Sequence, residues 1–221
     1  MSGDGGVWTV LVAAGSAERF GRPKQFQMLQ GRRVLDWALD AARAVSDGIV
    51  LVVPPDSPGL AVPGVDAVVP GGATRSTSVR AGLAAVPTEV DVIIVHDAAR
   101  PLATVELFER VVAAVRAGAD AAVPGVGVTD TLKQVYADGR VRTTVDRDGV
   151  VAVQTPQAFA APALRRGHAP GGEASDDAAL VEAVGGRVVV VAGEVDNLKI
   201  TWPQDLTTAR VVLEARAGTA P

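Results

Sequence analysis

The sequence predicts an α/β fold, in which a mostly parallel β-sheet is covered by helices. Short and almost continuous apolar runs alternate along the chain with segments whose apolar residues recur at helical spacing. Hydrophobic residues make up 48% of the chain but aromatic residues only 4%, so Val, Ala, Leu and Ile must form the core. These residues suit strands that are buried on both faces.

The elements follow in chain order from these patterns. The apolar runs predict strands at Trp8–Ala14, Ile49–Val53, Ala67–Val69, Val90–Val95, Ala121–Val123 and Val188–Val191. Helical spacing predicts helices at Val34–Val45, Ser76–Ala85, Val105–Ala117, Asp176–Val184 and Leu206–Ala215. Ser175 is predicted to cap one of them, with Asp176 and Asp177 facing the positive end of the helix dipole.

Residues 131–145 depart from this rhythm. Thr131–Tyr136 and Arg140–Val145 alternate polar and apolar residues, and the Asp138-Gly139 pair between them is a turn signal, so we expect a β-hairpin. A two-stranded hairpin is marginally stable alone. We therefore expect this arm to pack against a second copy of the chain; the alternative is a hairpin folded back on its own sheet.

Length, charge and cysteine content limit the classes of function. The 221 residues suffice for one large domain or for one domain with an appendage. The net charge of −4 argues against binding of bulk nucleic acid or of an anionic membrane. Without cysteine there are no disulfides, thiolate metal sites or Cys nucleophiles. No apolar run approaches the roughly 20 residues of a membrane span, and Met1–Gly6 lacks the pattern of a signal peptide, so we expect a cytoplasmic protein.

The loop after the first strand, Ala13–Gln25, is rich in small residues, as loops that bind phosphates are. It matches neither common phosphate motif. A dinucleotide fingerprint requires glycines where the chain has Gly15, Ala17 and Phe20, and the interval from Gly15 to Gly21 is one residue too long for a Walker A loop.

What distinguishes this loop is its charge. Arg19, Arg22 and Lys24 form a local cluster of cations in an acidic chain that has 18 Arg but only 3 Lys. Three phosphates of a nucleoside triphosphate match such a cluster. The alternative is a solvated basic loop without a ligand.

Seven stretches, spread over nearly the whole chain, together carry a resemblance to a known family. They are Ala13–Gln25, Gly71–Ser78, Val95–Pro101, Asp130–Lys133, Thr144–Arg147, Gln154–Gln157 and Asp196–Thr201. These stretches resemble, in the same order, motifs of the 2-C-methyl-D-erythritol 4-phosphate cytidylyltransferase family. The resemblance implies a single Rossmann-like nucleotidyltransferase domain over residues 1–221, with a dimerisation arm at residues 131–145. It also implies transfer of a cytidylyl group from CTP to methylerythritol phosphate, with release of pyrophosphate, in the non-mevalonate pathway to isoprenoids.

The resemblance implies the roles of the residues that meet CTP. Arg19 and Lys24 take the part of transition-state stabilisers on the triphosphate. Asp97, which follows a buried strand, is implied to hold Mg²⁺, or Mn²⁺ in its place, together with phosphate oxygens; the alternative for Asp97 is a cap of the turn that follows. The remaining implied CTP contacts are Ala13, Ala14, Gly15, Gly71, Gly72 and Ser78. Ala73 departs from the pattern, because some family members carry an acidic residue there.

For the acceptor, the resemblance points to Arg147 and Lys199 as the residues that position its phosphate. Secondary contacts are implied for Asp97, Arg100, Thr131, Thr155 and Ser175. In the family, the arm brings residues of one subunit to the site of the other, which implies a homodimer with shared active sites. Lys133, on the arm, has no assigned role.

The chemistry of such a transfer agrees with the residues present. A phosphate monoester is largely dianionic at neutral pH and needs no general base to attack phosphorus. The work is then positioning and charge neutralisation, and we interpret His96 as a packed residue at a strand end. The alternatives are a ribitol 5-phosphate cytidylyltransferase and, from a different class, a non-catalytic nucleotide-binding regulator.

Overall fold

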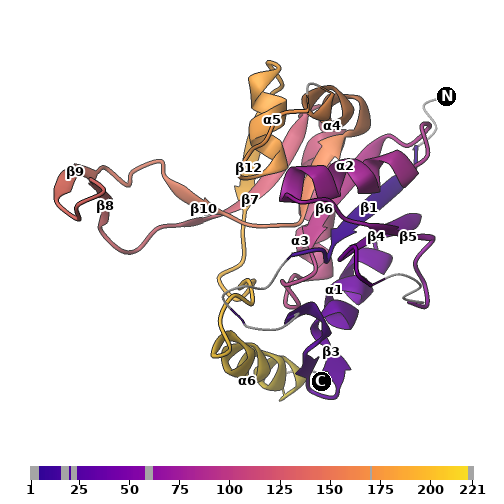
Figure 1. Ribbon diagram of the computed structural model, residues 1–221, viewed down its shortest axis with the longest axis horizontal. Helices are drawn as coiled ribbons and strands as arrows, with labels where there is room; N and C mark the ends of the chain where they lie inside the picture. The colour runs from indigo at the N-terminus through magenta and orange to yellow at the C-terminus, as the bar shows by residue number, and fades with distance from the viewer. Residues whose placement is uncertain (1–4, 16–19, 21–23, 58–61, 170, 219–221) are drawn as a thin grey trace.

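The computed structural model describes residues 5–15, 20, 24–57, 62–169 and 171–218, and it confirms the predicted α/β fold (Figure 1). The main sheet has the strand order β10-β7-β11-β6-β1-β4-β5, with β12 paired to β7. Its strands are β1 (Val7–Val12), β4 (Gly48–Val53), β5 (Ala67–Pro70), β6 (Val92–Asp97), β7 (Ala121–Gly127), β10 (Val151–Val153), β11 (Gln157–Ala160) and β12 (Val188–Ala192).

The parallel part of the sheet determines where a ligand can bind. β1 lies between β4 and β6 and runs parallel to both, and β5 runs parallel to β4. The carboxyl ends of these strands therefore meet at one edge, where ligands of open α/β sheets bind. β11 runs antiparallel between β6 and β7.

Helices cover both faces of the sheet. The strand β1 shows why, because Val10 and Leu11, both fully buried, point to opposite faces and join different apolar clusters. The cluster of Leu11 includes residues of α1 (Val34–Arg43) and α3 (Val105–Arg116), and that of Val10 includes residues of α2 (Arg75–Ala85), α4 (Ala161–His168) and α5 (Asp177–Ala183). A third cluster joins α6 (Asp205–Gly218) to the short strand β2 (Met28–Leu29), which pairs with β3 (Arg32–Arg33).

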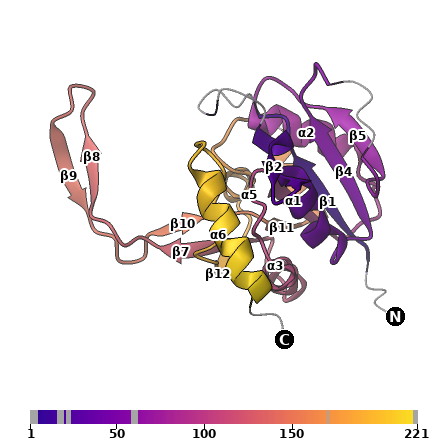
Figure 2. The same cartoon turned by 90° about the horizontal axis from the view of Figure 1, so that it is seen from below.

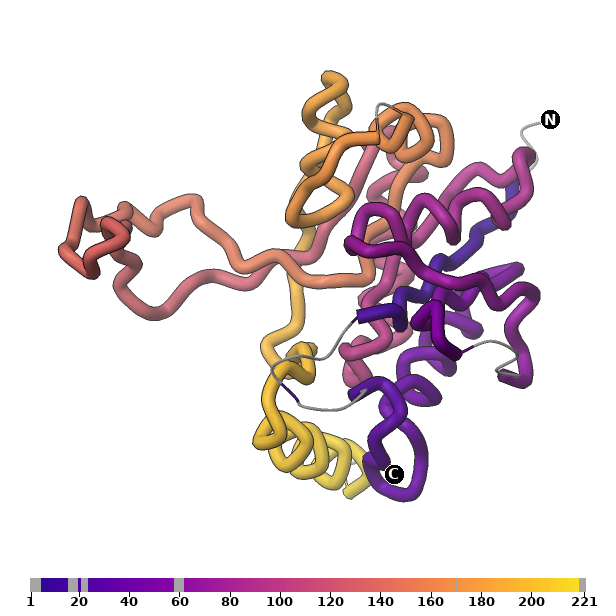
Figure 3. The backbone as a smooth tube through the Cα atoms, in the orientation of Figure 1, coloured from indigo at the N-terminus to yellow at the C-terminus, as the bar shows by residue number. Residues whose placement is uncertain are grey.

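The predicted hairpin is present as β8 (Leu132–Val135) and β9 (Val141–Val145), which form a separate two-stranded sheet. Gly139 adopts a φ of 83° in the turn, a conformation that favours glycine. The arm projects far from the body of the protein in both views (Figures 1 and 2), and the trace of the chain leaves and rejoins the body alongside β7 and β10 (Figure 3). The alternative of a hairpin folded back on its own sheet is therefore wrong.

Two details differ from the sequence prediction. The elements β2, β3, β10, β11 and α4 and the short 3₁₀ helix Lys24–Phe26 were not predicted. The cap of α5 is Asp176 rather than Ser175, because the Asp176 carboxylate accepts a hydrogen bond from the amide of Ala179 at 3.0 Å. Ser175 is thereby left for another role. Among the helices described, none is long and apolar enough to cross a membrane.

Candidate active site

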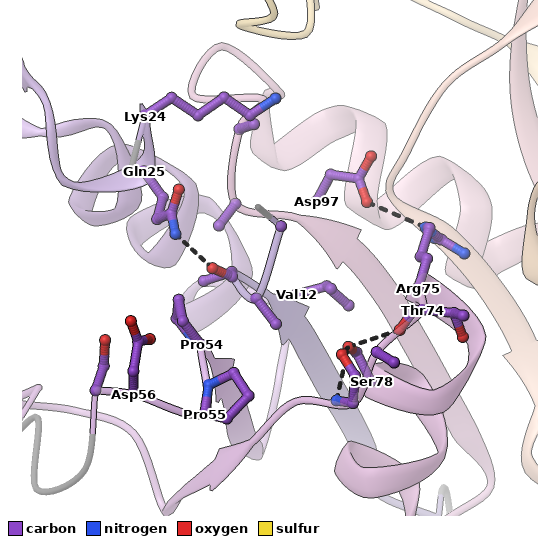
Figure 4. Close-up of a pocket in the computed structure, with 18 of the residues that line it drawn as sticks. Val12, Lys24, Gln25, Pro54, Pro55, Asp56, Thr74, Arg75, Ser78 and Asp97 are labelled. Atoms are coloured by element: carbon purple, nitrogen blue, oxygen red, sulfur yellow. Dashed lines mark hydrogen bonds and ion pairs between the residues drawn. The ribbon is translucent and has the colours of Figure 1, made fainter. Parts of the chain in front are cut away.

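A cavity of about 660 Å³ opens at the carboxyl ends of the parallel strands (Figure 4). Its volume lies in the range typical of sites for small molecules. Sequences that follow β1, β4, β5 and β6 form its walls. The predicted site residues among its lining are Ala13, Ala14, Gly15, Lys24, Gly72, Ser78, Asp97 and Lys199.

One buried side chain, that of Gln25, connects residues 24–26 to the segment that follows β1. The Gln25 side chain, 2% exposed, donates a hydrogen bond from Nε2 to the carbonyl oxygen of Ala13 at 2.6 Å. Lys24 immediately precedes this anchor, and its side chain extends over one end of the cavity in Figure 4. The predicted cations Arg19 and Arg22 lie outside the described residues.

The segment after β5 is shaped by close packing. A Cβ atom on Gly71 would lie 2.4 Å from the Cβ of Ala14, so only glycine allows the two segments to approach this closely. Gly71 itself does not line the cavity, whereas Gly72 does. The Ser78 hydroxyl donates to the carbonyl of Thr74 at 2.8 Å and accepts from the Gly72 amide at 3.1 Å. Ser78 thus organises the wall as well as lining it.

A smaller cavity of about 250 Å³ adjoins the first. It contains Arg100, Thr155 and Ser175, three of the residues expected to contact the acceptor. Arg100 donates from Nη1 to the carbonyl of Asn197 at 2.7 Å, which fixes its guanidinium at the wall. Residues common to the linings of both cavities are Arg75, Asp97 and Lys199.

Asp97 lies at this junction, where β6 ends, and is 8% exposed. Its Oδ2 accepts a hydrogen bond from Lys199 Nζ at 2.6 Å, and its Oδ1 lies 3.5 Å from Arg75 Nε. Burial by itself raises the pKa of Asp97, but the nearby charges of Lys199, Arg75 and Arg100 outweigh burial and hold the pKa well below its usual range. The carboxylate is therefore ionised at neutral pH and binds cations of the site rather than capping the next turn.

Arg75 is a functional candidate that the sequence interpretation did not select. It is the first residue of α2, and besides Asp97 it binds the buried Asp177, with Nη1 at 2.6 Å from Oδ2. Burial lowers the pKa of Arg75, but Asp97 and Asp177 outweigh this effect and raise it above its usual value. Its position in the chain could have identified Arg75 as a site residue, because Arg75 begins a helix that follows a strand end at the edge where ligands bind.

His96 is a packed residue, as predicted. It is fully buried, with Nδ1 at 3.0 Å from Thr155 Oγ1, and its ring contacts the edge of Phe108 at 4.9 Å between centroids. Burial is the largest effect on its imidazole and lowers the pKa of His96 to about 3. A ring that is neutral throughout the physiological range does not carry protons in this site.

Two predicted acceptor residues are not brought to these cavities by the described chain. Thr131 and Arg147 lie at the base of the arm, where Arg147 donates to the carbonyl of Thr129, and neither residue is in the lining of the two cavities described above. Conversely, residues 54–57 after β4 line the larger cavity and were not predicted. The rule that ligands bind at carboxyl ends of parallel strands pointed to residues 54–57.

The donor set at the junction suits one kind of metal ion. Among the described residues, no group of three or more His, Cys, Asp or Glu side chains is placed to hold an ion. Of the two carboxylates that line the larger cavity, Asp56 and Asp97, only Asp97 also lines the smaller one. Magnesium commonly binds one or two carboxylates together with substrate phosphates and water. The residues present therefore fit a magnesium ion shared with a nucleotide rather than one enclosed by protein.

Comparison of the chain with known families and proteins gives a consistent result. The model of the family described as 2-C-methyl-D-erythritol 4-phosphate cytidylyltransferase matches residues 7–215. A relative with that name from Rhodococcus jostii (strain RHA1) is 44% identical over 223 residues, which cover 97% of this chain and 98% of the relative. One from Nocardia farcinica (strain IFM 10152) is 44% identical over 224 residues and covers 97% of each chain.

Solved structures agree with these sequence matches. The crystal structure of 2-C-methyl-D-erythritol 4-phosphate cytidylyltransferase from Thermus thermophilus superposes with a TM-score of 0.79 at 38% identity, covering 93% of this chain and 98% of that one. The 4-diphosphocytidyl-2C-methyl-D-erythritol synthase from Anaerococcus prevotii superposes with a TM-score of 0.82 at 30% identity, covering 96% and 100%.

Proposed function

Because this chain belongs to the 2-C-methyl-D-erythritol 4-phosphate cytidylyltransferase family, we propose that its two adjoining cavities hold the two substrates of that reaction. The reaction transfers the cytidylyl group of CTP to 2-C-methyl-D-erythritol 4-phosphate in the synthesis of isoprenoid precursors. CTP occupies the cavity of about 660 Å³, and the acceptor occupies the cavity of about 250 Å³. The enzyme works in the cytoplasm, where its charged nucleotide substrate is available.

One observation carries this assignment: Arg75, Asp97 and Lys199 line both cavities. A phosphate of each substrate must come to this junction if the acceptor oxygen is to attack the α-phosphorus of CTP. The acceptor phosphate is already largely dianionic at pH 7, so the residues do not need to remove a proton. Their work is to hold the two anions together and to neutralise charge in the transition state.

The individual roles follow from the types of side chain. Lys24 carries a compact charge that can follow the α-phosphate as its geometry changes, and Arg19 adds a planar fork for two phosphate oxygens. Lys199 and Arg100 bind the phosphate of the acceptor, with Thr155 and Ser175 beside them. Asp97 holds Mg²⁺, or Mn²⁺ in its place. When bound, the ion neutralises negative charge on the phosphates.

The test of this function is a direct assay. Purified protein is incubated with CTP, methylerythritol phosphate and Mg²⁺, and pyrophosphate is measured. We expect pyrophosphate release that needs all three components and that stops when a chelator removes the ion. If no pyrophosphate forms with all components present, the proposed function is wrong.

The identity of the acceptor is tested in the same assay. The family match favours methylerythritol phosphate over ribitol 5-phosphate, which differs in its carbon skeleton. With both acceptors competing for limiting CTP, the product ratio reports their relative kcat/KM. We expect the methylerythritol product to predominate; a predominance of the ribitol product overturns the assignment of the acceptor.

We further propose that the active enzyme is a homodimer in which the arm reaches the partner's site. Val135, Tyr136 and Val141 on the arm are 60%, 50% and 57% exposed, an unusual clustering of apolar surface on a two-stranded hairpin. Thr131 and Arg147 lie at the base of the same arm, outside the cavities of their own chain. In a symmetric dimer they complete the acceptor site of the other subunit.

Mixing two inactive variants tests this arrangement. Arg147→Ala and Lys199→Ala homodimers each lack one acceptor contact in both sites, so we expect both to be impaired. After denaturation and joint refolding, about a quarter of wild-type activity returns, because about half of the dimers are mixed and each has one intact site of two. Activity that stays at the level of the separate variants, although mixed dimers are present by mass, contradicts shared sites.

A further inference from the structure

A chain of side chains linked by hydrogen bonds and ion pairs runs from the interior of the protein to the junction of the two cavities. Neighbouring polar atoms along it lie 3.0, 2.6, 3.5 and 2.6 Å apart. In order from the interior, its members are His168, Asp177, Arg75, Asp97 and Lys199. The proposed function places Arg75, Asp97 and Lys199 at the junction of the two substrates. It leaves His168 and Asp177 without a role, and it does not say what fixes Arg75 in position.

The inner end of this chain is buried and firmly held. Asp177 is fully buried at the start of α5 and His168, 4% exposed, is the last residue of α4. The two helices pack so closely that a Cβ on Gly167 would lie 3.0 Å from the backbone of Leu180. The Asp177 carboxylate accepts from His168 on one oxygen and from Arg75 on the other. Its position is thus set by the packing of two helices.

The outer end of this chain is more exposed, and its last residue is less firmly held. The side chain of Lys199 is 39% exposed, whereas that of Arg75 is 24% exposed and is held on its inner side by Asp177. Each oxygen of Asp97 is therefore bound to a different cation, one anchored and one at the end of a flexible stem. When a phosphate dianion enters the smaller cavity, the flexible cation is the one that can transfer to it.

We propose that Asp177 is a positioning residue for the transfer reaction: it holds Arg75 against Asp97, so that Asp97 keeps its place and a cationic partner when Lys199 binds the acceptor phosphate. This inference rests on the proposed function of Asp97 and Lys199. His168 supports Asp177 from the inner side. Without the anchored arginine, the Asp97 carboxylate loses the protein side chain that holds one of its oxygens while the lysine moves to the phosphate, and the carboxylate that orients the phosphates is free to move.

A double-mutant cycle separates this role from ordinary structural support. Asp177→Asn, Arg75→Gln and the double variant are compared for kcat, for KM of each substrate and for thermal midpoint. Because misplacement of a reacting group by about 1 Å can cost about 100-fold, we expect each single variant to lower kcat by about 10- to 100-fold. If Asp177 acts through Arg75, the double variant has about the same kcat as Arg75→Gln alone.

A second variant keeps the inference testable if Asp177→Asn does not fold. Arg75→Lys retains a positive charge beside Asp97, but an ammonium lacks the planar fork that contacts two carboxylates at once. We therefore expect its kcat to fall nearly as far as that of Arg75→Gln. The control is Arg80→Gln, on the same helix, which removes an arginine that binds Glu173 at 3.0 Å and lines neither cavity. Its kcat should stay within about twofold of wild type.

The outcomes distinguish this inference from the proposed function. A wild-type protein that releases no pyrophosphate refutes the proposed function itself. An active wild type refutes only the positioning role if Asp177→Asn retains normal kcat, if it lowers kcat by the same factor with and without Arg75, or if Arg75→Lys restores wild-type kcat.

Discussion

Replacing Lys24 with alanine lowers kcat by about 100- to 1,000-fold, the usual cost of removing one preorganised group that stabilises charge in a transition state. The reason is position as well as charge. Lys24 precedes Gln25, whose buried side chain is fixed to the carbonyl of Ala13, so its ammonium is presented to the cavity from a rigid base. The substitution leaves this anchor intact, and the thermal midpoint should change little.

Two further variants show whether Lys24 acts specifically. Lys24→Arg keeps the charge but replaces a compact ammonium by a planar fork, and we expect it to recover only part of the lost kcat. Arg210→Ala removes an exposed cation on α6 and should leave kcat unchanged. If Lys24→Ala and Arg210→Ala have the same kcat as wild type, the loop at Lys24 is a solvated basic surface.

The second large effect is expected from Asp97→Asn, which should lower kcat by about 100- to 1,000-fold. The variant loses the carboxylate that we assign to the metal ion, and it leaves Lys199 and Arg75 without their shared partner. The concentration of Mg²⁺ that gives half-maximal rate should rise in parallel. Both quantities are obtained from pyrophosphate release measured over a range of Mg²⁺ concentrations.

The pH dependence provides a check on the same carboxylate. The pKa of Asp97 is held below its usual range, so the group stays ionised as the pH falls to about 5, where an ordinary aspartate also remains ionised. Wild-type kcat should therefore show no acid limb from Asp97 above that pH.

The control for Asp97→Asn is Asp40→Asn, which removes an exposed carboxylate that binds Arg32 and Arg43 and lines neither cavity. A normal Mg²⁺ response in Asp97→Asn would contradict its role in holding the ion.

The sequence patterns predicted the parallel part of the fold because its strands are buried on both faces and are bounded by turn residues. The strands β1, β4 and β6 read as continuous apolar runs, and the helices after them show clear helical spacing. In contrast, β11 has only four residues and passes directly into α4, which has Pro162 in its first turn. β11 is too short to show a period, no turn separates it from α4, and no side chain caps the start of α4 to mark where the helix begins.

The candidate site was predictable where function depends on residues next to strand ends. Asp97 was found by its position at a strand end, Lys24 by the charge of its loop together with the family resemblance, and Lys199 by that resemblance alone. All three line the same cavity. Arg75 and Asp177 were not found, because their importance depends on a contact between residues that are 102 positions apart in the chain. Such a pairing leaves no local pattern in the sequence; it becomes visible only when α2 and α5 are seen on the same face of the sheet.

The close approach of Gly71 to Ala14 sets the width of the nucleotide cavity. The segments after β1 and β5 can lie this close together only because residue 71 has no side chain. A Cβ on Gly71 would come within 2.4 Å of the Cβ of Ala14. At an exposed position with ordinary backbone angles, a change from glycine to alanine has a small effect. At Gly71 the same change would push the two segments apart. The width of the site therefore depends on a residue that does not line the cavity.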